Sequence, residues 1–279
     1  MSESRAVLLT GAAGGIGTAV TQALLKRGVT VYAGVRGPAP QLAGAIPVRL
    51  DLTDPDSVAA AAQEIDRRQG GRGLHAVINN AGVIVQGPLE LLPEAELRRS
   101  FEVNVYGPVR VLREFLPQLR QGHGRVVNIG APAGDVGLPF AALLSASKAA
   151  LHALNDAVRV ELAPWRIPVV QVIPGGTRTE IFAKAATASA DVMATVDPEA
   201  LRRYRSAIEA VAAANARTPL DPVGKVTKAV LAAVLDTRPK ARYVVGNARI
   251  FDLLTKLPRG TRDRLILRTL GLNKVIVSR

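Results

Sequence analysis

The segment Leu8–Gly17 limits the fold of this 279-residue chain more than any other part of it. It reads LLTGAAGGIG, an apolar run that breaks into small residues and glycines. Arg5–Thr10 has the pattern of a buried strand, and Thr18–Arg27 has that of the helix behind it. Glycines also occur in tight turns for steric reasons alone. Between a strand and a helix, however, such a loop brings backbone N–H groups against a pyrophosphate, so the segment predicts a dinucleotide-binding loop.

Strand-like and helix-like segments alternate along the rest of the chain. Strand patterns occupy residues 29–35, 46–50, 74–78, 125–129, 167–173 and 242–245, and helical patterns occupy 56–69, 93–121, 142–162 and 222–235. This alternation predicts an α/β fold, a doubly wound parallel sheet of about seven strands with helices on both faces. A ligand crevice is expected at the carboxyl ends of the first and fourth strands, where the strand order reverses.

Composition favours a single globular unit. Hydrophobic residues make up 48% of the chain and charged residues 21%, close to the averages for soluble domains, and no linker is evident. We expect residues 1–279 to form one domain. The alanine-rich segment 177–217 is expected to close over a bound ligand as a lid, and residues 247–279 form a C-terminal extension.

Several site types are disfavoured by the residue counts. The chain has no cysteine, so disulfides and thiolate metal sites are excluded. Its three histidines are scattered and lack ligand spacing, and no metal site is expected. The sequence shows no signal peptide and no long uninterrupted apolar segment, which favours a soluble cytoplasmic protein.

The net charge of +13 is concentrated near the C-terminus. From Arg238 to Arg279 there are eleven basic and two acidic residues, a net of +9. Apolar residues at helical spacing, such as Ile250 and Leu253 and then Leu265 and Leu270, predict two basic amphipathic segments with a break at 258–260. We expect them to pack over the substrate mouth or a dimer partner, with a membrane surface as the alternative. No nucleic-acid partner is expected.

Five motifs occur in a consistent order along the chain: Thr10–Gly17, Asn79–Gly82, Asn104 within NVYG, Ser145–Lys148 and Pro174–Thr179. With these motifs the chain resembles the short-chain dehydrogenase/reductase family from Val7 to about Gly246. The segments 31–36 and 137–140 resemble most the hydroxysteroid and retinol dehydrogenase branch.

The resemblance implies a set of residues that contact a nicotinamide dinucleotide. Glycines of the loop would flank the phosphates, and residues after the third and fourth strands would contact the adenosine. Thr179 would hold the nicotinamide carboxamide and Lys148 the nicotinamide ribose. Plainer roles stay open, a capped turn for Asn79 and Asn80 and a helix cap for Thr179. The implied set is Thr10, Gly11, Gly15, Ile16, Gly17, Arg36, Asp51, Leu52, Asn80, Ala81, Gly82, Lys148, Pro174, Gly175 and Thr179.

Arg36 bears on the choice of coenzyme. A site that prefers NAD(H) places a carboxylate after the second strand to accept hydrogen bonds from the ribose 2′-OH, and that carboxylate would repel a 2′-phosphate. Here the position carries a guanidinium, nineteen residues after Gly17. We therefore expect NADP(H) in preference to NAD(H); the alternative is a surface arginine that leaves the ribose unread.

The resemblance breaks at the reacting groups. The family places a tyrosine four residues before the lysine and a serine thirteen residues before that tyrosine. Counting back from Lys148 gives Leu144 and then Ala131, and neither side chain can donate a proton. Asn104 and Lys148 are retained. A positioned acid is typically worth about 10² to 10⁴ in rate, so the family's usual route should be very poor.

Other side chains are candidates to replace the missing acid, and three functions follow. The first is an atypical NADP(H)-dependent oxidoreductase acting on a bulky apolar carbonyl or alcohol with a non-standard proton donor. The second is a non-redox cyclase, isomerase or dehydratase, and the third is a catalytically silent NADP(H)-binding protein. A homodimer or homotetramer through the helices of Asn104 and Lys148 is expected by resemblance. The candidate replacements for the missing proton donor are Tyr106, Asp135, Ser145, Ser147, His152 and Tyr204.

Overall fold

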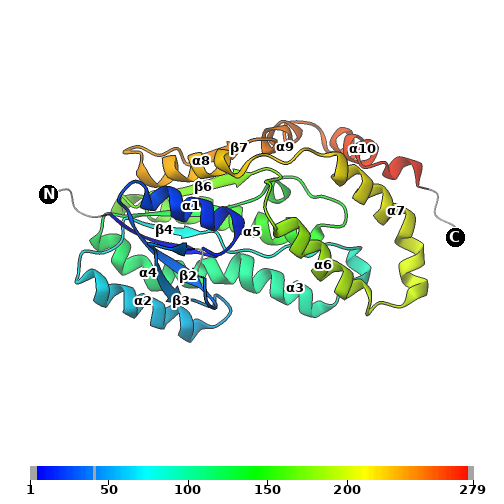
Figure 1. The fold of residues 1–279 in the computed structure, drawn as a ribbon. Helices are drawn as coiled ribbons and strands as arrows, with labels where there is room; N and C mark the ends of the chain where they lie inside the picture. Colours follow the sequence, from blue (N-terminus) through cyan, green and yellow to red (C-terminus); the bar gives the residue numbers. More distant parts are fainter. Residues whose placement is uncertain (1–4, 40–41, 276–279) are drawn as a thin grey trace.

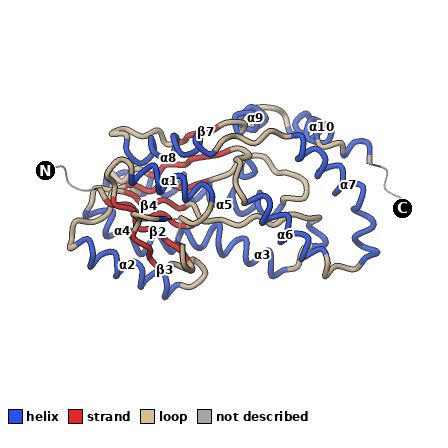
Figure 2. Tube along the Cα trace, viewed as in Figure 1, coloured by secondary structure: helices blue, strands red, loops and turns tan. Residues whose placement is uncertain are grey.

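A seven-stranded parallel sheet forms the centre of the computed structural model, which describes residues 5–39 and 42–275 (Figures 1 and 2). The strand order is β3-β2-β1-β4-β5-β6-β7. The chain therefore winds outward from β1 in one direction and from β4 in the other, as the alternating pattern predicts. The strands are β1 Ala6–Thr10, β2 Thr30–Val35, β3 Ile46–Arg49, β4 Ala76–Asn79, β5 Arg125–Ile129, β6 Val169–Pro174 and β7 Arg242–Val245.

Helices cover both faces of the sheet. They are α1 Gly15–Leu25, α2 Pro55–Gln69, α3 Glu94–Phe101, α4 Gly107–Gln121, α5 Ala142–Glu161, α6 Ile181–Met193, α7 Pro198–Arg217, α8 Val223–Leu235, α9 Ala248–Leu254 and α10 Arg259–Thr269. Short helical turns are η2 Leu89–Leu91, η3 Glu102–Tyr106, η4 Pro132–Gly134, η5 Ala163–Trp165 and η6 Leu272–Lys274.

Two apolar clusters, one on each side of the sheet, hold these layers together. Alternation along β1 divides its side chains, with Val7 and Leu9 in the cluster formed with α1 and α8. Leu8 belongs to the opposite cluster, with α2 and α4 (Figure 1). All three are fully buried. Each such leucine stabilises the fold by about 1.5–3 kcal/mol, so the sheet carries much of the core.

The helical pattern of residues 93–121 forms as predicted, with a local widening. The segment continues from α3 into α4 through η3, a π-helical turn that contains Asn104. A π turn inserts an extra residue into the helical ladder and is frequent at functional sites. Here it points the buried Asn104 side chain at the end of β4, where its amide bonds Val83.

The glycine loop differs in one respect from the sequence-based expectation. The helix after β1 starts at Gly15, three residues before the predicted start at Thr18, so Gly15 and Gly17 belong to its first turn. A Cβ on Gly17 would collide with the backbone of Gly11 and Ala12. Close packing of the loop on the helix therefore explains why glycines occupy a helical turn.

The segment 177–217, predicted as a lid, consists mainly of α6 and α7. The C-terminal extension follows β7 and lies along the same edge of the molecule as β7 (Figure 1). Its break falls at 255–258, slightly before the predicted position, because Pro258 is the N-cap of α10. No helix in residues 5–39 and 42–275 has the length and hydropathy needed to span a bilayer. Arg279, counted in the charge of the extension, lies outside the described residues.

Candidate active site

The glycine loop and the end of β4 are hydrogen-bonded together at the point where the strand order reverses. The Thr10 hydroxyl oxygen accepts the backbone N–H groups of Asn80 and Ala81, each at 3.0 Å. The Asn80 amide donates to the carbonyls of Thr10 and Gly11 at 3.1 and 3.0 Å. The Asn80 side chain therefore ties the loop after β4 to the glycine loop, and its coenzyme contact stays a prediction.

The start of α1 is open to an anion. Gly14, its N-cap residue, makes no side-chain capping bond, and the first turn contains no acidic residue. The partial positive charge of a helix N-terminus favours a phosphate there. Side chains on the glycines would obstruct this edge: a Cβ on Gly11 would lie 2.8 Å from Ala81 Cα, and one on Gly15 would lie 2.7 Å from Thr179 Cβ. The loop therefore fits a dinucleotide phosphate pair.

Two arginines end adjacent strands beside Asp51. Arg36 follows β2, and Arg49 ends β3 where it pairs in register with Val35. Both side chains are exposed, and neither guanidinium forms a hydrogen bond or ion pair with another of the described residues. Hydrogen bonds from the Thr53 N–H and hydroxyl, aided by the two guanidinium charges, lower the pKa of Asp51. Sequence reasoning missed Arg49, although parallel strands that end together place their last residues side by side.

Leu52 is positioned differently from its neighbour Asp51. Its side chain is buried, and a Cβ on Gly107 would lie 2.9 Å from Leu52 Cβ. The Leu52 carbonyl accepts a hydrogen bond from Arg110 at 2.9 Å. The adenine contact that the resemblance implies for Leu52 stays a prediction, and most of its side chain is committed to the core.

Asn104 and Ser147 form a buried polar pair behind β4. The Asn104 carbonyl oxygen accepts the Val83 N–H at 2.9 Å, and its amide donates to the Val83 carbonyl at 3.0 Å and to Ser147 Oγ at 3.0 Å. Ser147 Oγ in turn donates to the Leu144 carbonyl at 3.2 Å. Both polar side chains are thereby satisfied, and they hold the loop after β4 against α5.

Lys148 projects from α5 into the same region. Its Nζ donates to the Ile129 carbonyl at 2.8 Å, and burial lowers its pKa to about 8. A Cβ on Gly82 would lie 3.7 Å from Lys148 Nζ and 3.2 Å from Asn104 Oδ1. Lys148 makes no ion pair with a carboxylate among the described residues. Burial of its ammonium therefore has a large desolvation cost that no carboxylate among those residues offsets.

The positions where a serine and a tyrosine would be expected carry no reactive atom. Ala131 N–H donates to His152 Nε2 at 3.4 Å, and Leu144 is half-buried at the start of α5. The two serines nearby are occupied, since Ser145 Oγ accepts the Leu138 N–H at 3.2 Å and Ser147 is bound as described. The Ser147 hydroxyl is therefore engaged on both sides and does not replace the missing hydroxyls in this arrangement.

The remaining replacement candidates make contacts of their own. Tyr106 is 52% exposed and its ring lies 6.0 Å from the Arg110 guanidinium carbon. The Tyr204 hydroxyl donates to Glu90, and its ring makes an edge contact with Phe140 at 6.4 Å between centroids. The hydrogen bond to Glu90 raises the pKa of Tyr204. The Tyr204 phenol is therefore a poor proton donor in this conformation.

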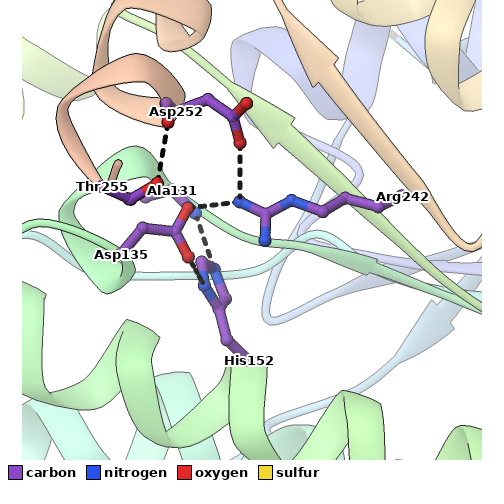
Figure 3. A network of polar contacts seen from close by, with 6 residues as sticks. All are labelled: Ala131, Asp135, His152, Arg242, Asp252 and Thr255. Carbon is purple, nitrogen blue, oxygen red and sulfur yellow. Dashed lines mark hydrogen bonds and ion pairs between the residues drawn. The ribbon is translucent and has the colours of Figure 1, made fainter. Parts of the chain in front are cut away.

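His152 and Asp135 belong to a network next to Ala131 (Figure 3). His152 Nδ1 lies 3.0 Å from Asp135 Oδ1, which also leaves Asp135 Oδ2 to bind Arg242. Because the Ala131 N–H is a donor, His152 Nε2 accepts and the ring proton is assigned to Nδ1. Burial raises the pKa of Asp135, but the His152 hydrogen bond and the Arg242 charge outweigh it and lower that pKa overall. Asp252 of α9 lies 3.9 Å from Arg242 and extends the network.

One face of α5 holds the end of β5 at three points. Lys148 bonds the Ile129 carbonyl, His152 bonds the Ala131 N–H, and Asn155 Oδ1 accepts from Asn128 Nδ2 at 3.1 Å. The three side chains are four and three residues apart, so they align on one side of the helix. The backbone around Ala131 is thus fixed by α5.

Pro174, Gly175 and Thr179 lie where β6 leads into the lid. Pro174 is the last residue of β6, and the Gly175 N–H donates to the Val245 carbonyl at 3.1 Å. Thr179 is not the cap of α6, whose N-cap residue is Glu180. Its side chain lies against the glycine loop, as the close approach to Gly15 shows. The structure therefore brings the start of the lid to the predicted phosphate site.

A protein-family model, described as short chain dehydrogenase, matches residues 5–190. The chain belongs to the short-chain dehydrogenase family. Among its relatives in this family is estradiol 17-beta-dehydrogenase 2 of Mus musculus, 36% identical over 74% of this chain and 56% of that protein. This chain thus spans just over half the length of that relative.

Two further proteins are similar to this chain over nearly their whole length. An NADPH-dependent 3-dehydrocapnine reductase of Ornithobacterium rhinotracheale is 32% identical over 88% of this chain and 89% of that protein. A short-chain dehydrogenase from Burkholderia cenocepacia, solved in complex with NADP, is 30% identical with a TM-score of 0.74, covering 95% of this chain and 98% of that one. The family, the Rossmann-type sheet and the hydroxysteroid dehydrogenase relatives are as the motifs predict.

Proposed function

We propose that this short-chain dehydrogenase is an NADP(H)-dependent oxidoreductase that acts on a bulky apolar carbonyl or alcohol, with Lys148 in place of the usual tyrosine as proton donor. The observation that carries the proposal is the buried Lys148 ammonium beside Gly82, with a pKa of about 8 and no carboxylate partner among the described residues. A lysine whose pKa lies near the operating pH is a suitable general acid and base.

The residues of the site fit a nicotinamide dinucleotide. The open α1 N-terminus and the glycines would hold its phosphates, and Lys148 and Asn104 flank the Cα of Gly82 where the ribose is expected. When bound, the nicotinamide supplies hydride for carbonyl reduction or accepts it in alcohol oxidation. The chain's own task is to hold a proton at Lys148 Nζ and deliver it to the carbonyl oxygen, directly or through a bridging hydroxyl.

NADP(H) is favoured over NAD(H) by the two exposed guanidinium groups of Arg36 and Arg49, which end adjacent strands. Together they offer charge-assisted hydrogen bonds to a 2′-phosphate. Two relatives point the same way, since one is named an NADPH-dependent reductase and another was solved with NADP.

The substitution Arg36→Glu is expected to weaken NADPH binding by roughly 10- to 100-fold while leaving NADH binding unchanged or stronger. A lost charge-assisted hydrogen bond is worth about 1.5–3 kcal/mol, and the new carboxylate repels a 2′-phosphate. Arg49→Glu should act in the same direction with a smaller effect. Fluorescence titration with both coenzymes measures these affinities.

The control for that experiment is Arg67→Glu, an exposed arginine on α2 with the same change of charge. It should alter neither affinity by more than about twofold, as expected of a surface charge change away from the site. An equal loss of NADPH and NADH affinity in Arg36→Glu would contradict the assignment.

An apolar substrate is favoured by the side chains where the lid meets the body. A Cβ on Gly87 would lie 3.0 Å from Met193 of α6 and 3.1 Å from Leu92. Phe140 meets Tyr204 of α7 nearby and has an unusual backbone φ of 58°. A bulky residue in the left-handed region is strained, and such strain is often kept at ligand sites.

The function is tested by following NADPH absorbance with a panel of apolar ketones and aldehydes across pH. Reduction should proceed fully when Lys148 carries its proton and decline as pH rises through about 8, while oxidation of the matching alcohol should show the opposite trend. Tight NADPH binding without turnover of any carbonyl would instead favour a catalytically silent NADP(H)-binding protein. Ala131 and Leu144 are the specific observation in favour of that second function, because neither offers a proton.

The homodimer or homotetramer stays a proposal. Val160 at the end of α5 is 65% exposed, and Trp165 just beyond it is 54% exposed. Large exposed apolar side chains at and just beyond the end of α5 are compatible with a subunit contact.

A further inference from the structure

The C-terminal extension has an inner side that packs on the body of the protein. Its first helix, α9, contacts β7 and η4, next to Ala131. Asp252 of α9 faces Arg242 of β7, as Figure 3 shows. Farther along, η6 contacts the lid helix α7. These contacts leave the other side of the extension facing outward.

The outward side exposes large apolar side chains from both helices. Ile250 and Leu253 of α9 are 60% and 62% exposed, and Leu265 and Leu267 of α10 are 40% and 41% exposed. Single exposed leucines are ordinary on soluble proteins. Four within two consecutive short helices form a group, and grouped apolar exposure marks an interaction surface.

Basic side chains surround this apolar group. Residues 248–274 contain seven lysines and arginines and two aspartates. Asp252 lies 3.9 Å from Arg242 and Asp263 lies 3.9 Å from Arg262, and the seven basic residues outnumber the two aspartates. The basic residues are Arg249, Lys256, Arg259, Arg262, Arg264, Arg268 and Lys274.

Basic and exposed apolar side chains are interspersed around both helices. On α9, Arg249, Ile250 and Leu253 fall within an arc of about 100°. On α10, Arg264 and Arg268 are one turn apart, and the exposed Leu265 and Leu267 project on either side of them. Long arginine side chains extend past neighbouring leucines and place their charge at the level of lipid headgroups.

From this arrangement we propose that the outward face of α9 and α10 docks the protein on the surface of an anionic lipid bilayer. Leucines and isoleucine would enter the headgroup boundary while lysines and arginines contact anionic headgroups, so apolar burial and electrostatic attraction would both contribute to binding. We call this surface the docking face; it consists of Arg249, Ile250, Leu253, Arg264, Leu265, Leu267 and Arg268.

An anionic bilayer matches the docking face better than the other partners that a basic surface could bind, which are a second copy of the chain and a nucleic acid. A second copy would bring the same positive charges opposite one another, which opposes association. Nucleic acid would be bound through its phosphates by the basic residues and gives no role to four exposed aliphatic side chains. Anionic lipid matches both the charge and the apolar side chains.

The test is co-sedimentation of the full chain with vesicles of phosphatidylcholine alone or with phosphatidylglycerol added. The chain should bind the anionic vesicles at least tenfold more tightly, and binding should weaken as salt is raised. The double variant Arg264→Glu/Arg268→Glu should lose most of this binding. Leu253→Ser should weaken it even at low salt, because the apolar contribution does not depend on charge.

Matched controls separate the docking face from general properties. Lys26→Glu/Arg67→Glu makes the same charge change with exposed residues at the ends of α1 and α2. Leu89→Ser removes a leucine that is 61% exposed, almost the same as Leu253. Both controls should bind vesicles as the natural chain does.

Four outcomes would overturn the proposal. They are absence of vesicle binding, equal binding to neutral and anionic vesicles, equal loss in the controls, and a docking-face variant that changes only the oligomeric state or RNA binding. Size-exclusion chromatography detects a change of oligomeric state, and titration with a single-stranded RNA detects a change in RNA binding. NADPH affinity of each variant serves as the check of folding and is independent of turnover.

Discussion

Restoring both hydroxyls, in Ala131→Ser/Leu144→Tyr, is expected to raise the rate of NADPH-dependent carbonyl reduction by about 10²-fold or more. A positioned general acid contributes about 10² to 10⁴, and a hydrogen bond to the developing oxyanion about 10² to 10³. The backbone at Ala131 is already fixed by His152, and Leu144 lies one helical turn before Lys148. Leu144 is only half-buried, so a larger ring has room to extend. Initial rates with the same carbonyl panel measure the gain.

The matched control for this gain is Ala131→Ser/Leu144→Phe, which supplies the ring without the phenol. It should reduce carbonyls no faster than the natural chain, because it restores no acid. An equal gain in both double variants would mean that pocket shape, and not proton transfer, limits the rate. Absence of any gain despite NADPH binding would refute the view that these two positions are where the family's reacting groups belong.

Lys148→Met is expected to lower turnover by at least about 10²-fold and yet to stabilise the fold near pH 7. Burial lowers the pKa of Lys148 from 10.5 to about 8, which corresponds to about 3 kcal/mol of destabilisation while the folded lysine is charged. Loss of the hydrogen bond to Ile129 offsets about 1 kcal/mol of this, leaving a net gain of about 1–2 kcal/mol.

The sign of the pH dependence follows from the direction of the shift. The destabilising contribution is complete below pH 8, shrinks between about pH 8 and 10.5, and is absent above that range. Urea unfolding of the natural chain and Lys148→Met at pH 7 and pH 10 should therefore show a smaller advantage at the higher pH. Lys26→Met, at the exposed end of α1, should change stability little at either pH. A stability difference that does not vary with pH would show that the buried charge is not its source.

The sheet and most helices could be predicted because residues close together in the sequence determine where each element begins and ends. Arg125–Ile129 and Arg242–Val245 form strands as expected, since each apolar run is bounded by turn residues. The lid was harder to assign. Its alanine-rich sequence predicts a segment that closes over a ligand, and alanine also favours the two long helices that form there.

The parts of the site that escaped prediction depend on contacts between distant residues. Asp135, His152 and Arg242 meet from a loop, a helix and a strand, and no local pattern relates them. Arg49 could have been found, because β2 and β3 were both predicted and parallel neighbours end at the same edge. The coenzyme contacts and the reacting group themselves stay predictions until tested.

The three contacts from α5 to the end of β5 have a further consequence. Two of them are hydrogen bonds to backbone atoms, the Ile129 carbonyl and the Ala131 N–H. They therefore do not depend on which side chain residue 131 carries. Such a scaffold lets chemistry be gained or lost by single substitutions at low structural cost. Evolution can therefore change what this enzyme framework does without first having to rebuild it.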